Sequence, residues 1–225
     1  MLPKTYLTRL AEIHGRRRPR AYLEIGVCAG RSLALAGADT NAFGVDPDPQ
    51  VTETLGSGTS IFRDTSDRIF GDPGIVRELA RHPLDLVFID GLHLFEAALR
   101  DFLNAARYCA PDARIVFHDT LPHDAQMALR NRETQAWTGD VWKAVLALKR
   151  LRPYLEITTL DTPPTGLTIV GNIDPADRFD AEEVEVVARE LMELGFRDFH
   201  SLGMAALNVV PDSVAAMERL VPQSA

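Results

Sequence analysis

Short apolar runs closed by glycine or aspartate recur through the first half of the chain, and this pattern restricts the fold more than any other feature. The runs have the length of buried strands rather than of helices. Segments with helical spacing lie between several of them, most clearly at 93–107. Strands that alternate with helices predict an α/β protein with a mostly parallel sheet. The runs lie at 21–25, 42–45, 60–62, 84–89 and 113–117.

The periodicity divides the chain into three parts. Residues 1–20 are expected to hold an N-terminal helix that ends at Gly15, because glycine commonly closes a helix. Residues 21–172 are expected to form the sheet domain. Residues 173–225 read as a C-terminal helical extension with a capping-box pattern at its start. Packing, dimerisation and a lid over the substrate are the roles that this extension could have.

Charge and cysteine content restrict the classes of partner and the cellular compartment that we expect for this protein. The chain has 32 acidic and 24 basic residues, a net charge of −8, and an acidic surface repels phosphate backbones. We therefore expect no nucleic-acid partner. No apolar stretch is long enough for a signal peptide or a membrane span, so we expect no membrane partner and a cytoplasmic location. Cys28 and Cys109 are expected to be free, buried thiols, as in a reducing compartment.

The turn after the first apolar run predicts a ligand site. In parallel sheets, ligands bind beyond the carboxyl ends of the strands. Gly26 and Gly30 allow the backbone to approach a ligand closely, but their GxxxG spacing does not match the GxGxxG turn that grips a pyrophosphate. Glu24, two residues before Gly26, favours a cationic ligand. Asp46 lies 20 residues after Gly26, where a carboxylate can accept both hydroxyls of a ribose.

These features together describe a nucleoside with a charged amino-acid tail, which is S-adenosylmethionine. Asp64 and Thr65, after the third run, are the candidates for holding the adenine amino group. A nicotinamide-dependent oxidoreductase is a rival interpretation. The GxxxG spacing and the lack of a Tyr-x-x-x-Lys pair count against it.

A second group of polar residues follows the next two runs. Asp90 and Asp119 end neighbouring strands, and two close carboxylates repel each other unless a cation lies between them. Oxygen ligands suit Mg²⁺ or Mn²⁺, and His118 could join them as a third metal ligand. His93 begins the next helix and can act as a general base near neutral pH.

These motifs resemble those of the class I S-adenosylmethionine-dependent methyltransferases. The stretch YLEIGVCAGRSLALAG is similar to the first motif of the catechol O-methyltransferase type. FIDGLHLFEAALRDF and IVFHDT are similar to the metal-dependent macrocin and mycinamicin sugar O-methyltransferases. The resemblance covers roughly residues 20–172 and implies a Rossmann-like, doubly wound sheet of seven strands whose last strand is antiparallel. The apolar runs at 155–159 and 166–170 fit the closing strand pair.

The resemblance also implies roles for individual residues. Glu24, Gly26 and Gly30 would line the methionine end of the cofactor, and Ser32 would bond its carboxylate. It agrees with Asp46 at the ribose, with Asp64 and Thr65 at the adenine, and with Asp90 and Asp119 at a divalent cation. Asp90 is counted with the cofactor residues as well. His93 matches the position of the general base, whereas His118 departs from the family pattern, which usually has a carboxylate there.

The sequence therefore predicts methyl transfer from S-adenosylmethionine to a hydroxyl of a small-molecule acceptor, assisted by a divalent cation. Metal-independent methylation of nitrogen is one alternative. A non-catalytic partner protein that keeps the cofactor fold is another. A homodimer is a further expectation that the residues leave open.

Overall fold

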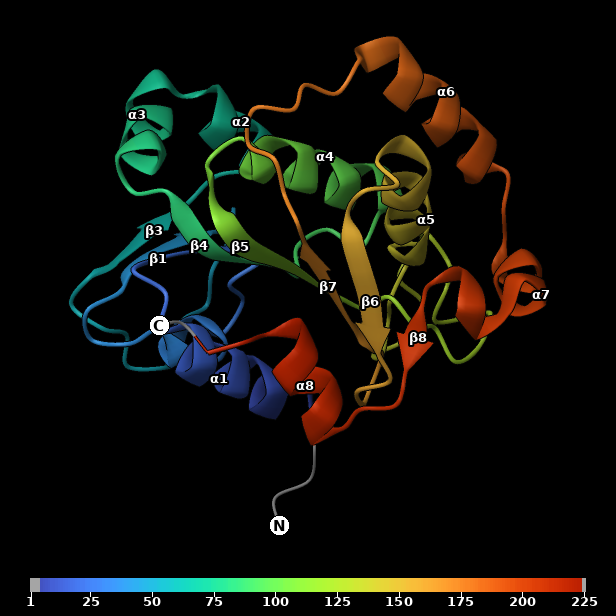
Figure 1. The fold of residues 1–225 in the computed structure, drawn as a ribbon, viewed down its shortest axis with the longest axis horizontal. Coiled ribbons are helices and arrows are strands. Elements are labelled where there is room, and N and C mark those ends of the chain that lie inside the picture. Colours follow the sequence, from blue (N-terminus) through green and yellow to red (C-terminus); the bar gives the residue numbers. More distant parts are fainter. Residues whose placement is uncertain (1–4, 224–225) are drawn as a thin grey trace.

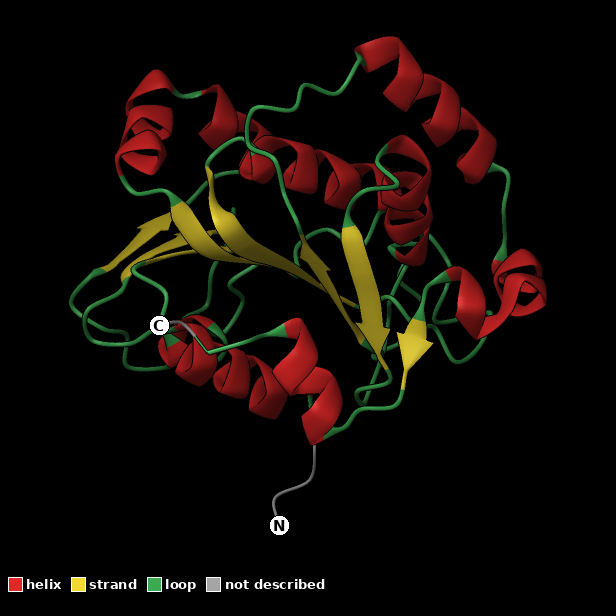
Figure 2. Ribbon diagram, viewed as in Figure 1, coloured by secondary structure: helices red, strands yellow, loops and turns green. Residues whose placement is uncertain are grey.

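The computed structural model describes residues 5–223, which fold around one twisted sheet of eight strands (Figures 1 and 2). The strand order is β3-β2-β1-β4-β5-β7-β6-β8, and only β7 runs antiparallel to its neighbours. This confirms the predicted mostly parallel α/β sheet. The strands are β1 (Ala21–Ile25), β2 (Asn41–Val45), β3 (Thr59–Phe62), β4 (Leu84–Ile89), β5 (Cys109–His118), β6 (Glu156–Leu160), β7 (Leu167–Gly171) and β8 (Val209–Val210).

Helices cover both faces of the sheet. Figure 1 shows α2 to α6 over one face and α1 with α8 over the other. Strands that are covered on both faces are apolar along their whole length, which is why β1 and β4 are buried at every position. The helices are α1 (Tyr6–Arg17), α2 (Ser66–Gly71), α3 (Pro73–Arg81), α4 (Phe95–Ala106), α5 (Trp142–Leu151), α6 (Ala181–Met192), α7 (Phe196–Ala206) and α8 (Val214–Leu220).

Several local predictions differ from the structure. The helix α1 does not end at Gly15 but continues to Arg17, whose buried guanidinium bonds the carboxylate and carbonyl of Asp112. This tertiary contact outweighs the weak helix propensity of glycine. The segment after the glycine turn, for which the residues RSLALAG suggest a short helix, forms only a 3₁₀ turn at Leu33–Leu35, on which α1 packs directly.

The sheet also differs from expectation at two places. Pro111 and Asp112, a residue pair typical of a turn, lie inside β5, where the register against β4 shifts and the strand bulges. The eighth strand, β8, comes from the C-terminal extension and pairs in parallel with β6. A strand of only two residues has no apolar period from which it could be predicted.

The C-terminal extension wraps the edge of the sheet. The helix α6 packs on α5, β8 extends the sheet, and α8 lies beside α1 on the opposite face (Figure 1). Met217 of α8 is fully buried in that second core, and Asp212 pairs with Arg9 of α1 at 2.6 Å. These contacts fit the packing role, while dimerisation and a lid stay predictions. Among residues 5–223, no helix is long and apolar enough to cross a bilayer.

Candidate active site

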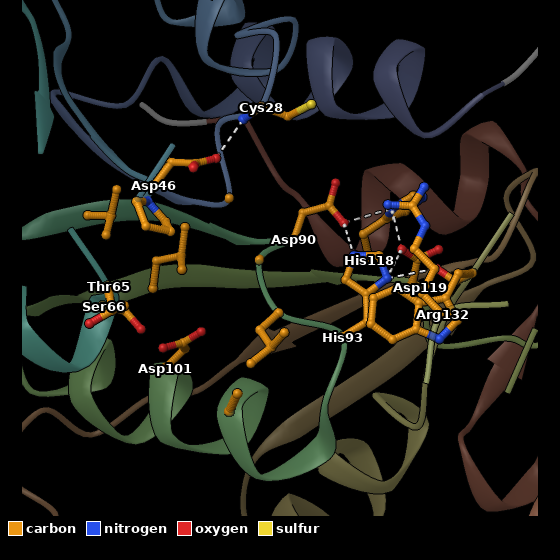
Figure 3. Close-up of a pocket in the computed structure, with 18 of the residues that line it drawn as sticks. Cys28, Asp46, Thr65, Ser66, Asp90, His93, Asp101, His118, Asp119 and Arg132 are labelled. Atoms are coloured by element: carbon orange, nitrogen blue, oxygen red, sulfur yellow. Dashed lines mark hydrogen bonds and ion pairs between the residues drawn. The ribbon is translucent and has the colours of Figure 1, made fainter. Parts of the chain in front are cut away.

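A cavity of about 710 Å³ opens at the carboxyl ends of β1, β2, β4 and β5 (Figure 3). The turns after these strands supply most of its walls. The N-terminus of α2, one face of α4 and the loop before α5 complete it. The predicted site residues that line it are Gly26, Asp46, Thr65, Asp90, His93, His118 and Asp119, whereas Glu24, Gly30, Ser32 and Asp64 do not.

The glycine turn brings β1 against β4. Gly26 has a φ of +93°, and a Cβ atom there would lie 2.2 Å from the carbonyl oxygen of Asp90, so only glycine fits. Asp46 at the end of β2 holds the turn, because its Oδ2 accepts from the amides of Val27 and Cys28 at 2.9 and 2.8 Å. Asp46 also lines the cavity, and its Oδ1 accepts from the Asp48 amide at 2.8 Å. Its contact with ribose hydroxyls stays a prediction.

Cys28 is exposed in this turn, contrary to the expectation that both cysteines are buried. Its backbone adopts the left-handed conformation with a φ of +47°, and the residue lines the cavity. Cys109 is buried as expected, and burial raises the pKa of its thiol. Both thiols are free, as the sequence predicted.

Glu24 and Ser32 lie beneath the turn rather than in the cavity wall. The carboxyl group of Glu24 is fully buried and accepts hydrogen bonds from Tyr22 Oη at 2.5 Å and Ser32 Oγ at 2.8 Å. Burial raises the pKa of Glu24 to about 8, although these two hydrogen bonds act against the rise. In the structure, this network supports the glycine turn from below. A direct contact of either residue with the cofactor stays a prediction.

The far end of the cavity lies between α2 and α4. Thr65 and Ser66 line it, but Asp64 turns back to its own backbone, accepting from the Thr65 amide at 2.8 Å. Arg68 also pairs with Asp64 at 3.6 Å. Asp101 of α4 lines the cavity here and was missed from the sequence. The sequence did offer a signal for Asp101, because it is an acidic residue on the otherwise apolar, buried face of a predicted helix.

Four titratable side chains meet at the other end of the cavity (Figure 3). His118 Nδ1 lies 3.0 Å from Asp90 Oδ1 and 3.3 Å from Asp119 Oδ2. His93 reaches the same two carboxylates, with Nδ1 3.3 Å from Asp119 and Nε2 3.7 Å from Asp90. Asp119 has a φ of +58°, and Thr165 Oγ1 donates to its Oδ1. The predicted convergence of Asp90 and Asp119 is therefore present.

The two carboxylates control the charge of His118. Burial alone would lower the pKa of this imidazole, but the negative charges of Asp90 and Asp119 outweigh it and raise the pKa to about 10. Burial would likewise raise the pKa of Asp119, yet the hydrogen bond from His118 holds it below its usual value. His118 thus neutralises part of the acidic cluster, with the ring of Tyr6 packed at 4.1 Å.

The orientation of His93 is set by the loop before α5. His93 Nδ1 lies 2.7 Å from the carbonyl oxygen of Trp137, and a carbonyl can only accept. Nδ1 must therefore carry a proton, which leaves Nε2 as the acceptor in the neutral ring. The indole of Trp137 stacks on the imidazole, with centroids 4.9 Å apart. The contact between the Trp137 carbonyl and His93 joins residues 44 positions apart, so the sequence gives no signal for it.

One oxygen or nitrogen each from Asp90, His93 and Asp119 lies within 4.8 Å of the others, a separation that could hold a metal ion. This set differs from the predicted one by containing His93, whereas His118 points its Nδ1 at the two carboxylates as a hydrogen-bond donor. Two carboxylates and an imidazole fit a divalent cation, and the nitrogen ligand suits Mn²⁺, Fe²⁺ or Zn²⁺ better than Mg²⁺.

Comparisons with solved structures find the same fold at low sequence identity. Rv0187 from MTB, solved with cofactor bound, aligns with a TM-score of 0.58 at 19% identity, over 77% of this chain and 83% of its own. The O-methyltransferase TomG from Streptomyces achromogenes, solved with SAM, gives 0.55 at 17%, over 75% and 79%. An O-methyltransferase from Bacillus cereus, solved with SAH, gives 0.52 at 13%, over 74% and 80%. No curated protein matched the chain.

A protein-family model matches the part of the chain that forms β1 to β5. The model of the methyltransferase domain matches residues 23–120, which span β1 to β5 and contain the glycine turn and the acidic cluster. The predicted resemblance is therefore confirmed. Residues 23–120 are similar to the methyltransferase domain family, and the sheet has the class I methyltransferase fold.

Proposed function

We propose that the protein transfers the methyl group of S-adenosylmethionine to a hydroxyl group of a small-molecule acceptor, with His93 as the general base. The tautomer of His93 carries this proposal. Nδ1 is tied to the carbonyl of Trp137 at 2.7 Å, so Nε2 is the ring nitrogen that can take a proton in the cavity. Solved O-methyltransferases that share the fold favour transfer to oxygen.

The donor supplies a methyl group already activated on a sulfonium. The protein has to align donor and acceptor and remove the acceptor proton, so positioning carries much of the rate. As the acceptor oxygen forms its bond to the methyl carbon, the carbon–sulfur bond breaks and its electron pair stays on sulfur. The hydroxyl proton passes to His93 Nε2. The ring of Trp137 stacks on His93 and the ring of Tyr6 packs on His118, and both rings line the cavity, which suits a planar acceptor.

A metal-assisted reaction is the second candidate, favoured by the grouping of Asp90, His93 and Asp119 within 4.8 Å. A bound divalent cation would lower the pKa of an acceptor hydroxyl. Asp90 and Asp119 would hold this cation through their carboxylate oxygens. His93 would then serve as a ligand, and His118 would have to release its hydrogen bonds to the carboxylates.

Release of S-adenosylhomocysteine in the presence of an acceptor panel tests the main proposal. The panel should hold phenols, sugar hydroxyls and hydroxy acids beside primary and secondary amines. Turnover with a hydroxyl acceptor supports the proposal, and turnover with amines alone replaces it with N-methylation. If calorimetry shows S-adenosylhomocysteine binding but no acceptor is methylated, a non-catalytic role takes its place.

A metal titration separates the two candidates. Activity should be measured after chelator treatment and again after adding Mg²⁺ or Mn²⁺, in the wild type and in Asp119→Asn. Activity that disappears with chelator, returns with one cation and is missing in Asp119→Asn supports metal assistance. Full activity after chelation supports His93 acting without a cation.

A further inference from the structure

Asp101 is the one residue on the buried stripe of α4 that carries a charge, and the sequence analysis gave it no role. It is 3% exposed, and the other buried residues of this helix are apolar. The hydroxyl of Ser66 lowers the pKa of the Asp101 carboxyl group by hydrogen bonding. Arg100, the neighbouring cation, pairs instead with Asp67 at 3.2 Å. Within residues 5–223, no ion pair compensates the burial of this carboxyl group.

The position of Asp101 suggests what it faces. It lines the cavity together with Thr65 and Ser66, on the side away from the cluster of Asp90 and His118 (Figure 3). The reacting methyl group must lie at that cluster, beside His93. Asp46 marks the ribose at the end of β2. The base of a nucleoside held this way extends beyond Asp46, toward the wall between α2 and α4.

Asp64, the residue expected to read the base, is turned away and occupied by its own backbone and by Arg68. Asp101 is the buried carboxyl group left facing this end of the cavity. Buried polar groups are normally hydrogen-bonded, so a carboxyl group with a single hydroxyl partner has acceptor capacity left for a ligand.

We propose that Asp101 is the residue that selects adenine, by accepting a hydrogen bond from the exocyclic amino group of the bound nucleoside. Ser66 orients the carboxyl group from α2. A hypoxanthine base carries an oxygen in place of that amino group, so two acceptors would face each other in a buried site when Asp101 is ionised. The inference rests on the proposed binding of S-adenosylmethionine and concerns the specificity of that same site.

The electrostatics of the pocket wall fit this role. Burial raises the pKa of Asp101 to about 7, and the charge of Asp67 raises it further, whereas Ser66 and Arg100 lower it. Each protonation form keeps an oxygen that accepts from an amino group, but the protonated form can also donate to a carbonyl oxygen. Selection of adenine is therefore strongest above the pKa of Asp101. Because the carboxyl group of Asp101 can take up a proton, it can stay buried without a paired cation when no ligand is bound.

Calorimetry with two nucleosides tests the proposal. The wild type, Asp101→Asn and the control Asp39→Asn, an exposed carboxylate outside the cavity, are titrated with S-adenosylhomocysteine and with its deaminated analogue S-inosylhomocysteine. The titrations are run at about pH 8.5, where the carboxyl group of Asp101 is ionised. We expect the wild type to prefer the adenine compound at least about tenfold, the range of a hydrogen bond to a carboxyl group. In Asp101→Asn, whose amide both donates and accepts, the preference falls below about threefold. Asp39→Asn keeps the wild-type preference.

The outcomes separate this proposal from the proposed function. If the wild type does not bind S-adenosylhomocysteine, the proposed function fails. If it binds both nucleosides equally, or if Asp101→Asn keeps the full preference, the role of Asp101 is overturned while the function stands. Should Asp101→Asn fail to fold, Asp101→Ser takes its place, because a hydroxyl also donates and accepts and carries the same expectation.

Discussion

Gly139 lies directly against the backbone of His93. A Cβ atom at Gly139 would come within 1.7 Å of the His93 carbonyl oxygen, and the glycine has a φ of +54°. The loop before α5 can therefore approach the start of α4 only with glycine at this position. The same approach places the Trp137 carbonyl on His93 Nδ1. A backbone contact outside the cavity thus sets the orientation of the proposed base.

Gly139→Ala is expected to lower turnover more than it lowers cofactor affinity, because the loop must move away from His93. We also expect a loss of stability of about 2 kcal/mol or more from the left-handed backbone and the clash. Gly15→Ala is the matched control, since no atom lies within 4 Å of its added Cβ. Chemical denaturation and steady-state kinetics measure both effects. Unchanged kinetics in Gly139→Ala would show that the loop does not orient His93.

Replacement of His93 by alanine removes the proposed proton acceptor. Turnover should fall by about 10²- to 10⁴-fold, the usual contribution of general base catalysis. Affinity for S-adenosylhomocysteine should change little, because the glycine turn and Asp46 are untouched. His200→Ala is the control, since this histidine is exposed on α7 and does not line the cavity. Turnover within twofold of wild type in His93→Ala would remove His93 from the reaction.

Cys28 offers a chemical probe of cofactor binding. It is exposed and lines the cavity in the glycine turn, whereas Cys109 is buried and its pKa is raised. Iodoacetamide should therefore modify one thiol in the folded protein, identified as Cys28 by peptide mass analysis. Saturating S-adenosylhomocysteine should slow this modification at least about tenfold, because the ligand competes for the same space. NAD is the control ligand, and equal rates with and without S-adenosylhomocysteine would contradict the location of the site.

His14 is expected to weaken the fold in acid. Its ring is buried between α1 and β1, and burial lowers its pKa from 6.5 to about 4. The unfolded chain takes up a proton below pH 6.5, but the folded chain does so only near pH 4. Stability is therefore unaffected above pH 6.5 and falls as the pH drops through this window, by about 3 kcal/mol at full effect.

His14→Phe removes this titration while keeping a ring against Tyr22. The difference in unfolding free energy between His14→Phe and wild type, measured by denaturant titration, should grow in favour of the variant between pH 6.5 and pH 4. His82→Phe serves as the comparison, because His82 is half-buried at the surface end of α3 and pairs with Glu78. A constant difference across this range would show that His14 is not held neutral by burial.

Much of the sheet was readable from the residues. Apolar runs such as 21–25 and 84–89 are confirmed as β1 and β4 because strands buried on both faces have few alternatives. The convergence of Asp90 and Asp119 followed from the same reasoning, since parallel strands end at one edge. Helix lengths were less readable. Gly15 lies inside α1 because the distant contact between Arg17 and Asp112 extends the helix.

The candidate site was also predictable only in part. The sequence by itself determined which residues follow strands, and therefore that Asp46, Asp90, His93 and Asp119 share one rim. Only the tertiary structure decided where their side chains point. It turned Asp64 back onto its own backbone, buried Glu24 below the glycine turn and brought Asp101 from α4 into the cavity wall. The positions of the strands along the chain follow from local apolar patterns, whereas side-chain direction depends on packing between segments far apart in the chain.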